Sequence, residues 1–197
     1  MLIPFEPMKA VQAAAVLLKA DGALRASRLR LLTLLYIADR ESLQSRARPI
    51  TGDSVIALNH GPVPEAADAM IAGEHDAAPL WARYVERVGR RDVRLVDDPG
   101  IGELTRYEIA KLTEVAERYA DADDWAVAEY GQTFPEWIGH KPEKGGRNVI
   151  PVEDLLEATG LGGVKDQLLA KAQGDAAAHG ILKQAERELA RERLGVQ

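Results

Sequence analysis

The chain has 197 residues, 46% of them hydrophobic, so it can bury one substantial core. Its formal net charge of -6 at pH 7 argues against tight, sequence-independent binding to nucleic acid, which depends on a summed basic field along the phosphates. It contains no cysteine, which excludes disulfides, thiolate metal sites and cysteine nucleophiles and is compatible with a reducing cytosol.

The first nine residues, MLIPFEPMK, lack the basic region followed by an apolar region that marks a secretory signal. No apolar run approaches the roughly 20 residues that a membrane helix needs. We therefore expect a soluble, cytoplasmic protein with no membrane partner. On length, we expect one main domain over residues 1–160 and a helical extension over residues 161–197.

Two helices are predicted in the first part of the chain. Apolar residues at helical spacing indicate one over about residues 6–20, and Ser27 is a suitable N-cap for the next. The second helix begins LRLLTLLYIA and is apolar on nearly every side, a pattern typical of a helix buried in the middle of a bundle. We expect the core to include Leu31, Leu34, Leu35 and Ile37.

Proline and glycine then divide the chain into shorter elements. Pro49 blocks the continuation of a helix, and Thr51 with Asp53 offers caps for a short helix that reaches about Leu58. A further helix is expected over about residues 64–73, because a proline and a glutamate suit its first turn and a glycine follows its last.

The stretch from Trp81 to Val96 alternates apolar and polar residues on either side of Gly89, in the manner of two strands joined by a turn. It is the only convincing strand signal in the sequence. Beyond it, residues 104–119 return to helical spacing, and residues 131–137 are expected to form an irregular turn.

These elements predict a mainly α fold: a compact helical domain with one small β-hairpin, followed by a C-terminal helical extension. A short helix over about residues 152–158 precedes the extension, whose composition is helical over residues 164–194. The order of helices and hairpin is like that of winged-helix modules, which serve DNA binding and protein binding alike.

The residues indicate neither a catalytic nor a metal-binding site. The four histidines, at positions 60, 75, 140 and 179, lack the spacing of a metal pair, and nucleotide-binding and hydrolase motifs are absent. Paired carboxylates such as Asp97 and Asp98 lie in polar, turn-like contexts that favour solvated caps over acid–base chemistry. We therefore expect no catalytic residues, no cofactor and no metal.

Asp39 and Arg40 end the predicted central helix and have two interpretations. They form a local ion pair at a solvated helix end, which would contribute little to stability. Alternatively, Asp39 holds the loop of Thr51, Gly52 and Asp53 against the core. The sequence alone leaves both interpretations open.

A second candidate is the sequence Asn59-His60-Gly61-Pro62-Val63. Gly61 permits unusual backbone angles and Pro62 restricts the next residue, so a rigid corner would present His60 and Val63 to a partner without an ordering cost. The same residues would also suffice for a tight turn between two helices, with His60 capping the first helix.

Five arginines make the densest positive cluster in the chain, on and beside the predicted hairpin. They are Arg83, Arg87, Arg90, Arg91 and Arg94. Neighbouring acidic residues dilute the cluster, which favours a solvated strand face first, a surface for an acidic protein second and a nucleic-acid surface last.

Three motifs in the first third of the chain carry a family signature. Residues 34–40 read Leu-Leu-Tyr-Ile-Ala-Asp-Arg, residues 49–53 read Pro-Ile-Thr-Gly-Asp, and residues 60–63 read His-Gly-Pro-Val. In this order they closely resemble the Panacea, or SocA-like, antitoxin domain. The resemblance covers roughly residues 5–140. It includes a later element ending in Pro-x-Trp, from which Gln132 departs because a histidine is more usual ahead of the proline.

The resemblance implies a type II antitoxin from a bacterium or phage that neutralises, by direct binding, a toxin usually encoded beside it. One relative, SocA, delivers its toxin to the ClpXP protease, so a proteolytic adaptor that also meets ClpX is a further implication. The alternative function is a winged-helix-like, DNA-binding transcriptional regulator. Residues expected to bind the partner or shape the site are Asp39, Arg40, Thr51, Asp53, Asn59, His60, Gly61, Pro62 and Val63.

The extension lies outside the resemblance but carries apolar residues at helical spacing. Because an amphipathic helix gains most of its stability from packing, we expect the extension to dock on its own domain, on a second copy or on the toxin. The residues that would dock are Leu168, Leu169, Ala172, Ile181, Leu182, Ala185, Leu189 and Leu194.

Overall fold

In the computed structural model, residues 2–20 and 22–178 are described. The helices are α1 (Pro7–Ala20), α2 (Arg28–Arg46), α3 (Glu65–Ala72), α4 (Ala78–Tyr84), α5 (Arg106–Arg118), α6 (Asp124–Gly131), α7 (Pro135–His140) and α8 (Val152–Ala158), followed by a 3-10 turn (Gly162–Val164) and a helical segment over residues 165–178. The strands are β1 (Arg25–Ser27), β2 (Val55–Leu58), β3 (Gly61–Pro64), β4 (Val85–Val88), β5 (Asp92–Leu95) and β6 (Asn148–Ile150). The prediction of a mainly helical fold is confirmed.

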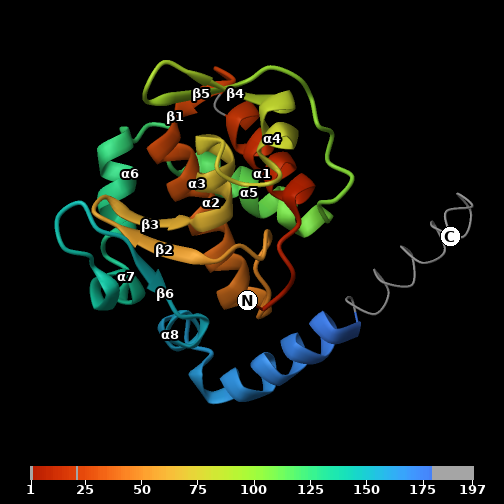
Figure 1. Cartoon of the computed structure of the whole chain (residues 1–197), viewed down its shortest axis with the longest axis vertical. Coiled ribbons are helices and arrows are strands. Elements are labelled where there is room, and N and C mark those ends of the chain that lie inside the picture. Colours follow the sequence, from red (N-terminus) through yellow and green to blue (C-terminus); the bar gives the residue numbers. More distant parts are fainter. Residues whose placement is uncertain (1, 21, 179–197) are drawn as a thin grey trace, which may run out of the picture.

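Helix α2 forms the centre of the fold, with α1, α5, α6 and β3 packed around it (Figure 1). Ser27 is its N-cap, as predicted, and the Ser27 hydroxyl accepts a hydrogen bond of 3.0 Å from the Arg30 backbone N–H. The predicted core residues are each at most 4% exposed: Leu31, Leu34, Leu35 and Ile37. The nearly continuous apolar sequence of α2 is therefore explained by neighbours on most of its sides.

Two small antiparallel sheets accompany the helices, where the sequence predicted one hairpin. One has the strand order β1-β5-β4 and the other β3-β2-β6. In Figure 1 the first lies at the top of the molecule and the second crosses the lower part of α2. The predicted β4–β5 hairpin is present, and β1 pairs with β5, which makes β5 the central strand of this sheet. The winged-helix analogy is not confirmed.

The predicted strands over residues 81–96 are too long at their start. Trp81 and Tyr84 belong to α4, and the first strand begins only at Val85. Trp81 and Tyr84 are three residues apart, which places both on one face of a helix, and both are buried. The same apolar residues therefore fit a helical period as well as a strand period over so short a stretch.

The predicted short helix up to Leu58 is wrong, because residues 55–58 form β2. Strand β2 lies between β3 and β6, and Ile56 is opposite Val63 on one side and Val149 on the other. Three consecutive residues of β2, Val55, Ile56 and Ala57, are buried, as is typical of an internal strand. Pairing on both sides satisfies backbone groups that a helix would have satisfied locally.

The sequence interpretation of residues 121–137 missed α6. Asp123 caps this helix by accepting a hydrogen bond of 2.8 Å from the Ala126 backbone N–H. Gly131 lies in its last turn, where a Cβ would stand 3.4 Å from Pro62 of β3, so the missing side chain lets α6 approach the sheet. The expected irregular turn over 131–137 is wrong: residue 131 ends α6, residues 135–137 begin α7, and only residues 132–134 connect the two helices.

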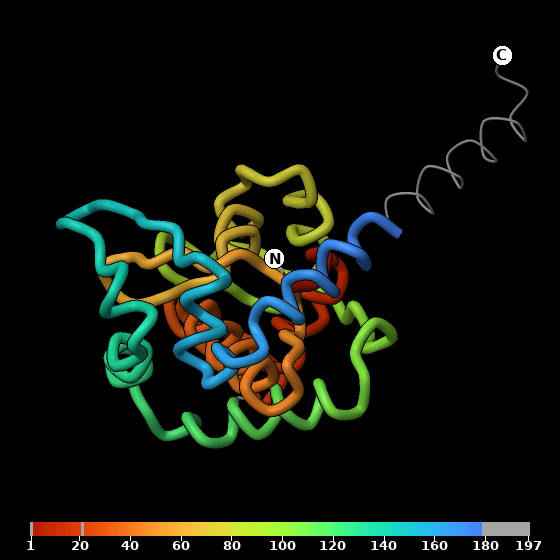
Figure 2. The backbone as a smooth tube through the Cα atoms, turned by 90° about the horizontal axis from the view of Figure 1, so that it is seen from below, coloured from red at the N-terminus to blue at the C-terminus, as the bar shows by residue number. Residues whose placement is uncertain are grey.

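The first part of the extension docks on its own domain. Leu168 and Leu169 pack against a cluster formed by Leu2, Leu43 and Leu156. Figure 2 shows this helical segment crossing near the end of α2 and then leading away from the domain. The predicted docking residues Ile181, Leu182, Ala185, Leu189 and Leu194 lie outside the described residues. Within the described part of the chain, no helix is long and apolar enough to cross a membrane.

We predict that Leu35→Ala lowers the free energy of unfolding by about 2 to 5 kcal/mol, because a fully buried leucine of α2 leaves a cavity when truncated. Val96→Ala is the matched control, since the Val96 side chain is 45% exposed and should lose less than about 1 kcal/mol. Urea unfolding followed by circular dichroism measures both. Equal midpoints for Leu35→Ala and wild type would show that α2 is not the core of the domain.

Candidate functional site

Contrary to the prediction, Asp39 and Arg40 do not end the central helix, because α2 continues to Arg46. The carboxylate of Asp39 joins α2 to the loop over residues 50–53. Its Oδ1 accepts hydrogen bonds from the backbone N–H groups of Ile50 (2.8 Å) and Thr51 (2.9 Å), and its Oδ2 accepts one from the Thr51 hydroxyl. Asp39 is only 9% exposed. Of its two sequence interpretations, the local ion pair with Arg40 is wrong, and the loop clamp is present.

Asp53 connects the same loop to α3. Its two carboxylate oxygens accept hydrogen bonds from the backbone N–H groups of Ala66 (2.8 Å) and Ala67 (2.9 Å), and its own N–H donates to the Thr51 hydroxyl oxygen (3.2 Å). The N-cap position of α3 is Pro64, whose side chain makes no capping bond. Asp53 therefore caps the helix after the hairpin and not, as predicted, one that it begins itself.

Gly52, between these two residues, has a physical reason to be glycine. Its φ of +72° lies in the left-handed region, and a Cβ there would stand 2.6 Å from the Ile3 side chain and 2.8 Å from the carbonyl oxygens of Ile3 and Pro4. The N-terminal segment therefore lies directly on the loop.

Burial raises the pKa of both carboxyl groups in this network. The pKa of Asp39 rises to about 6 and that of Asp53 to about 7, because removal from water disfavours the charged form more than the hydrogen bonds favour it. The negative charge of Asp39 also raises the pKa of Asp53. Both groups thus titrate closer to neutral pH than ordinary aspartates.

Arg40, the next residue of α2, meets Glu136 of α7. Its Nε donates to Glu136 Oε1 (2.6 Å), one Nη donates to the Ala158 carbonyl of α8 (3.2 Å), and its guanidinium lies 4.2 Å from the centre of the Phe134 ring. The Tyr36 hydroxyl also donates to Glu136, and burial together with this carboxylate raises the Tyr36 pKa.

Glu136 was missed by the sequence interpretation. It has a buried carboxylate that joins α2 to the later family element, in which it is the middle residue of Pro135-Glu136-Trp137. The adjacent Trp137, which is buried, was the only local signal, since Pro135 on the other side is exposed. Trp137 adds a second connection, because its indole N–H donates to the Leu58 carbonyl oxygen of β2 (2.9 Å).

A cavity of about 160 Å³ adjoins the Asp39 clamp. Its lining includes Tyr36, Asp39, Arg40, Asp53, Val55 and Leu155. This volume is below the 300 Å³ or more typical of ligand pockets. Among the described residues, no group of three or more His, Asp or Glu side chains could hold a metal ion.

The predicted rigid corner is a hairpin turn. Asn59 and His60 connect β2 to β3, and Gly61 follows with a φ of +126° that favours glycine. His60 is exposed and caps no helix; its ring lies edge-on to Trp125 of α6, with 5.2 Å between ring centres. In the amide orientation that satisfies both groups, Asn59 donates to the Glu143 carbonyl (3.2 Å) and accepts from the Gly145 N–H (2.7 Å).

Beside the hairpin runs a groove of about 450 Å³, here called the Trp125 groove. It lies between the start of α2, the β2–β3 hairpin, α6 and the β4–β5 turn, and its lining includes Leu29, Leu32, Leu58, Val63, Arg90 and Trp125. The structure thus brings His60 and Val63 together with Arg90 and Arg91, although the sequence treated them as two separate candidate surfaces.

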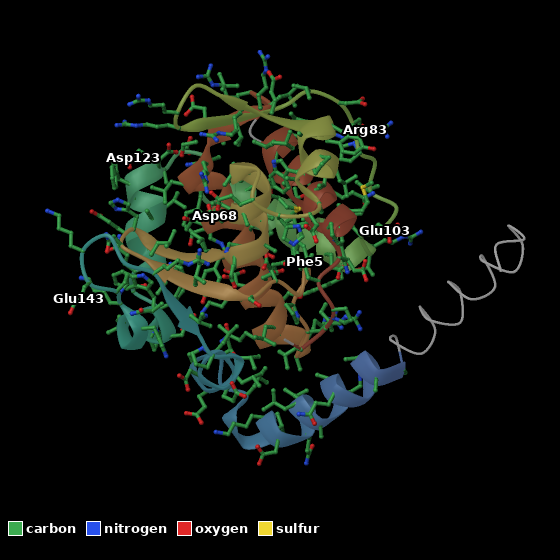
Figure 3. The ribbon with its side chains drawn as sticks, viewed as in Figure 1. Phe5, Asp68, Arg83, Glu103, Asp123 and Glu143 are labelled. Atoms are coloured by element: carbon green, nitrogen blue, oxygen red, sulfur yellow. The ribbon has the colours of Figure 1, made fainter. Side chains whose placement is uncertain are left out.

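The five candidate arginines do not form one patch. Arg94 pairs with Glu86 across the outer face of the sheet, and the Arg83 guanidinium lies over the Tyr84 ring, 5.2 Å from its centre. Arg83 precedes β4 and Arg90 follows it, so they lie at opposite ends of that strand; Figure 3 labels Arg83 beside α4. Only Arg90 and Arg91 of the five line the Trp125 groove.

Comparison with known proteins gave one result. The family model described as "Antitoxin SocA-like, Panacea domain" matches residues 31–138, more than half of the chain. The match includes the Asp39 clamp, the hairpin, α6 and Glu136. Neither the curated proteins nor the solved structures gave a significant match.

We predict that Gly52→Ala lowers the free energy of unfolding by about 2 to 5 kcal/mol, the sum of a left-handed backbone cost and an overpacking cost. Gly73→Ala is the control, because Gly73 also has a positive φ (+84°) but has open space around its Cα. It should lose only about 1 to 2 kcal/mol. Urea unfolding compares them, and equal losses would show that the N-terminal segment does not rest on the loop.

We also predict that wild type loses stability relative to Asp39→Asn as the pH rises from about 4 to 7. Because the folded-state pKa of about 6 lies above the unfolded value of about 3.9, the folded protein binds the additional proton below pH 6, and this stabilisation disappears as the proton leaves. The relative loss should be on the order of 3 kcal/mol. Parallel stability curves for the two proteins across this pH range would contradict the prediction.

Proposed function

Because the chain belongs to the antitoxin SocA-like, Panacea domain family, we propose that it neutralises a cognate toxin protein by binding it directly. The observation that carries the proposal is the arrangement of the signature residues. Asp39, Thr51 and Asp53 form one hydrogen-bonded network, and Arg40 joins Glu136 in a second. Together they support a hairpin whose turn, at His60, is exposed. A surface held in place before contact binds with a smaller ordering cost.

The same contacts favour binding over catalysis. Asp39 and Asp53 are engaged with backbone N–H groups at 2.8 to 2.9 Å, and Glu136 is engaged with Arg40 and Tyr36. A general acid or base needs a position within reach of a substrate proton. These carboxyls are instead occupied in holding the helices and the loop together, which supports a protein without enzymatic activity.

Regulation by DNA binding is the weaker alternative. The net charge is -6, and two arginines of the β1-β5-β4 sheet, Arg25 and Arg94, are neutralised by Asp92 and Glu86. Sequence-independent contact with phosphates needs several unneutralised cations on one face. The hairpin that suggested a DNA-binding wing presents only a few.

Neutralisation has two forms that the family allows. In the first, the bound antitoxin covers the active surface of the toxin. In the second, implied by the resemblance to SocA, the antitoxin delivers the toxin to ClpXP through an additional contact with ClpX. The half-life of the toxin in cells with and without ClpX distinguishes them, because only delivery makes the half-life depend on the protease.

We predict that the product of the reading frame next to this gene stops growth when expressed alone, and that co-expression of this chain restores growth. The affinity-tagged chain should retain the neighbouring product through affinity purification and elute with it in size-exclusion chromatography. Mass spectrometry identifies the partner and measures the stoichiometry.

An empty vector and a tagged, unrelated protein of similar size are the controls, at expression levels matched by immunoblot. If the neighbouring product still stops growth and elutes separately from a folded, equally expressed chain, the proposed function is wrong. A purified chain that instead binds its own upstream DNA at moderate salt would support the regulator.

A further inference from the structure

Trp125 is largely exposed to solvent, so packing in the core does not explain a tryptophan at this position. Of the three tryptophans, Trp81 and Trp137 are 2% and 3% exposed, whereas Trp125 is 59% exposed. Exposed aromatic residues beside other apolar groups with a charged rim are typical of protein interaction sites. The Trp125 groove has this composition.

The position of Trp125 is set by buried neighbours on its helix. Val127 and Ala128 are fully buried, so α6 is held against the domain, while Asp123 caps its first turn. The His60 ring contacts the indole from the hairpin side, with the two ring planes nearly perpendicular. In Figure 3, the labelled Asp123 marks this end of α6, on the same side of the molecule as the β4–β5 turn. Trp125 is thus presented on a rigid element.

The charges of the groove are unbalanced. Its two acids are already paired, Asp68 with Arg28 (2.6 Å) and Asp124 with Arg30 (3.8 Å). Arg90 and Arg91 lie on the exposed β4–β5 turn and have no ion pair within the described part of the chain. The groove therefore offers two unneutralised guanidinium groups on a protein whose net charge is -6.

The neighbouring strand is unsuited to pairing with a partner strand. β3 is an edge strand of its sheet, and two of its four residues, Pro62 and Pro64, have no backbone N–H. Recognition at this position must therefore use side chains in the groove and not a strand added to the sheet.

We propose that the cognate toxin docks in the Trp125 groove through a segment that carries a large apolar side chain flanked by carboxylates. The apolar side chain packs on Trp125 beside the half-buried Leu58, and the carboxylates meet Arg90 and Arg91. This proposal rests on the antitoxin function proposed above and adds the site and the chemistry of the partner segment.

The test uses the full-length chain and the purified product of the neighbouring reading frame. The groove variants are Trp125→Ala and the double charge reversal Arg90→Glu/Arg91→Glu. The matched control is Arg83→Glu/Arg87→Glu, which reverses two arginines at or near the same hairpin that do not line the groove. A thermal melt of each variant verifies that it is folded.

Trp125→Ala should raise Kd about 30-fold or more, as expected for a central aromatic anchor. Arg90→Glu/Arg91→Glu should lower the association rate at least about tenfold at low salt and less at high salt, because the effect is electrostatic. Arg83→Glu/Arg87→Glu should change Kd less than about threefold. Neutralisation of growth arrest should follow the same order.

Tryptophan fluorescence provides a readout that a general loss of stability would not mimic. In the free chain, acrylamide should quench Trp125 and largely spare the two buried tryptophans. Saturating toxin should protect that component, and Trp125→Phe should remove it. Overlapping synthetic peptides that cover the toxin sequence then identify the bound segment, which should contain a large apolar residue and at least one Asp or Glu.

Four outcomes would overturn the proposal. If wild type and both groove variants neutralise equally, the toxin docks elsewhere and the antitoxin function stands. If the toxin peptide that binds is basic and lacks Asp and Glu, the proposed chemistry of the partner segment is wrong, and the antitoxin function again stands. If the groove variants lose binding to duplex DNA and keep toxin binding, the surface belongs to nucleic acid. If wild type itself does not bind the toxin, the proposed function fails first and this inference fails with it.

Discussion

The hydrogen bonds of one buried carboxylate, Asp39, hold together most of what surrounds the candidate site. They secure the loop over residues 50–53 against α2. Within that loop, Asp53 caps α3, and Gly52 lies in close contact with the N-terminal segment. Because β2 begins directly after the loop and α3 follows β3, the clamp restrains the hairpin from both ends.

A second buried carboxylate, Glu136, connects α2 to α7 in an equivalent way. Its carboxylate accepts hydrogen bonds from Arg40 and Tyr36 of α2, and Arg40 also donates to the carbonyl oxygen of Ala158 in α8. Buried ion pairs often contribute little net stability, because desolvation offsets the attraction between the charges. Their directional contacts nevertheless specify how α2, α7 and α8 are arranged around one another.

The residues of these two networks support the fold from inside, and they are largely different from the residues that line the Trp125 groove. Most of the signature residues are buried, and four of them bind backbone groups: Asp39, Arg40, Thr51 and Asp53. His60 and Val63 of the signature line the groove together with residues outside it, including Trp125 and Arg90. The family signature is therefore carried mainly by the interior of the domain, and the proposed partner surface lies mostly outside that signature.

The sequence by itself determined the helices with strong local signals. The period and cap of α2, the start of α3 and the bounds of α8 all depend on residues within a few positions of one another, and their prediction was accurate. The motifs were also sufficient for the family, since a long ordered pattern needs no knowledge of contacts. The β4–β5 turn was found for the same reason.

Only the tertiary structure decided the second sheet, α6 and the groove. β2 and β6 are 90 residues apart in sequence, and no local pattern reports that Ile56 will have strands on both sides. Asp53 caps a helix 13 residues away, and Glu136 meets Arg40 across 96 residues. Such partners are selected by burial and hydrogen-bond satisfaction in the assembled domain, and that assembly brings His60, Arg90 and Trp125 to one surface.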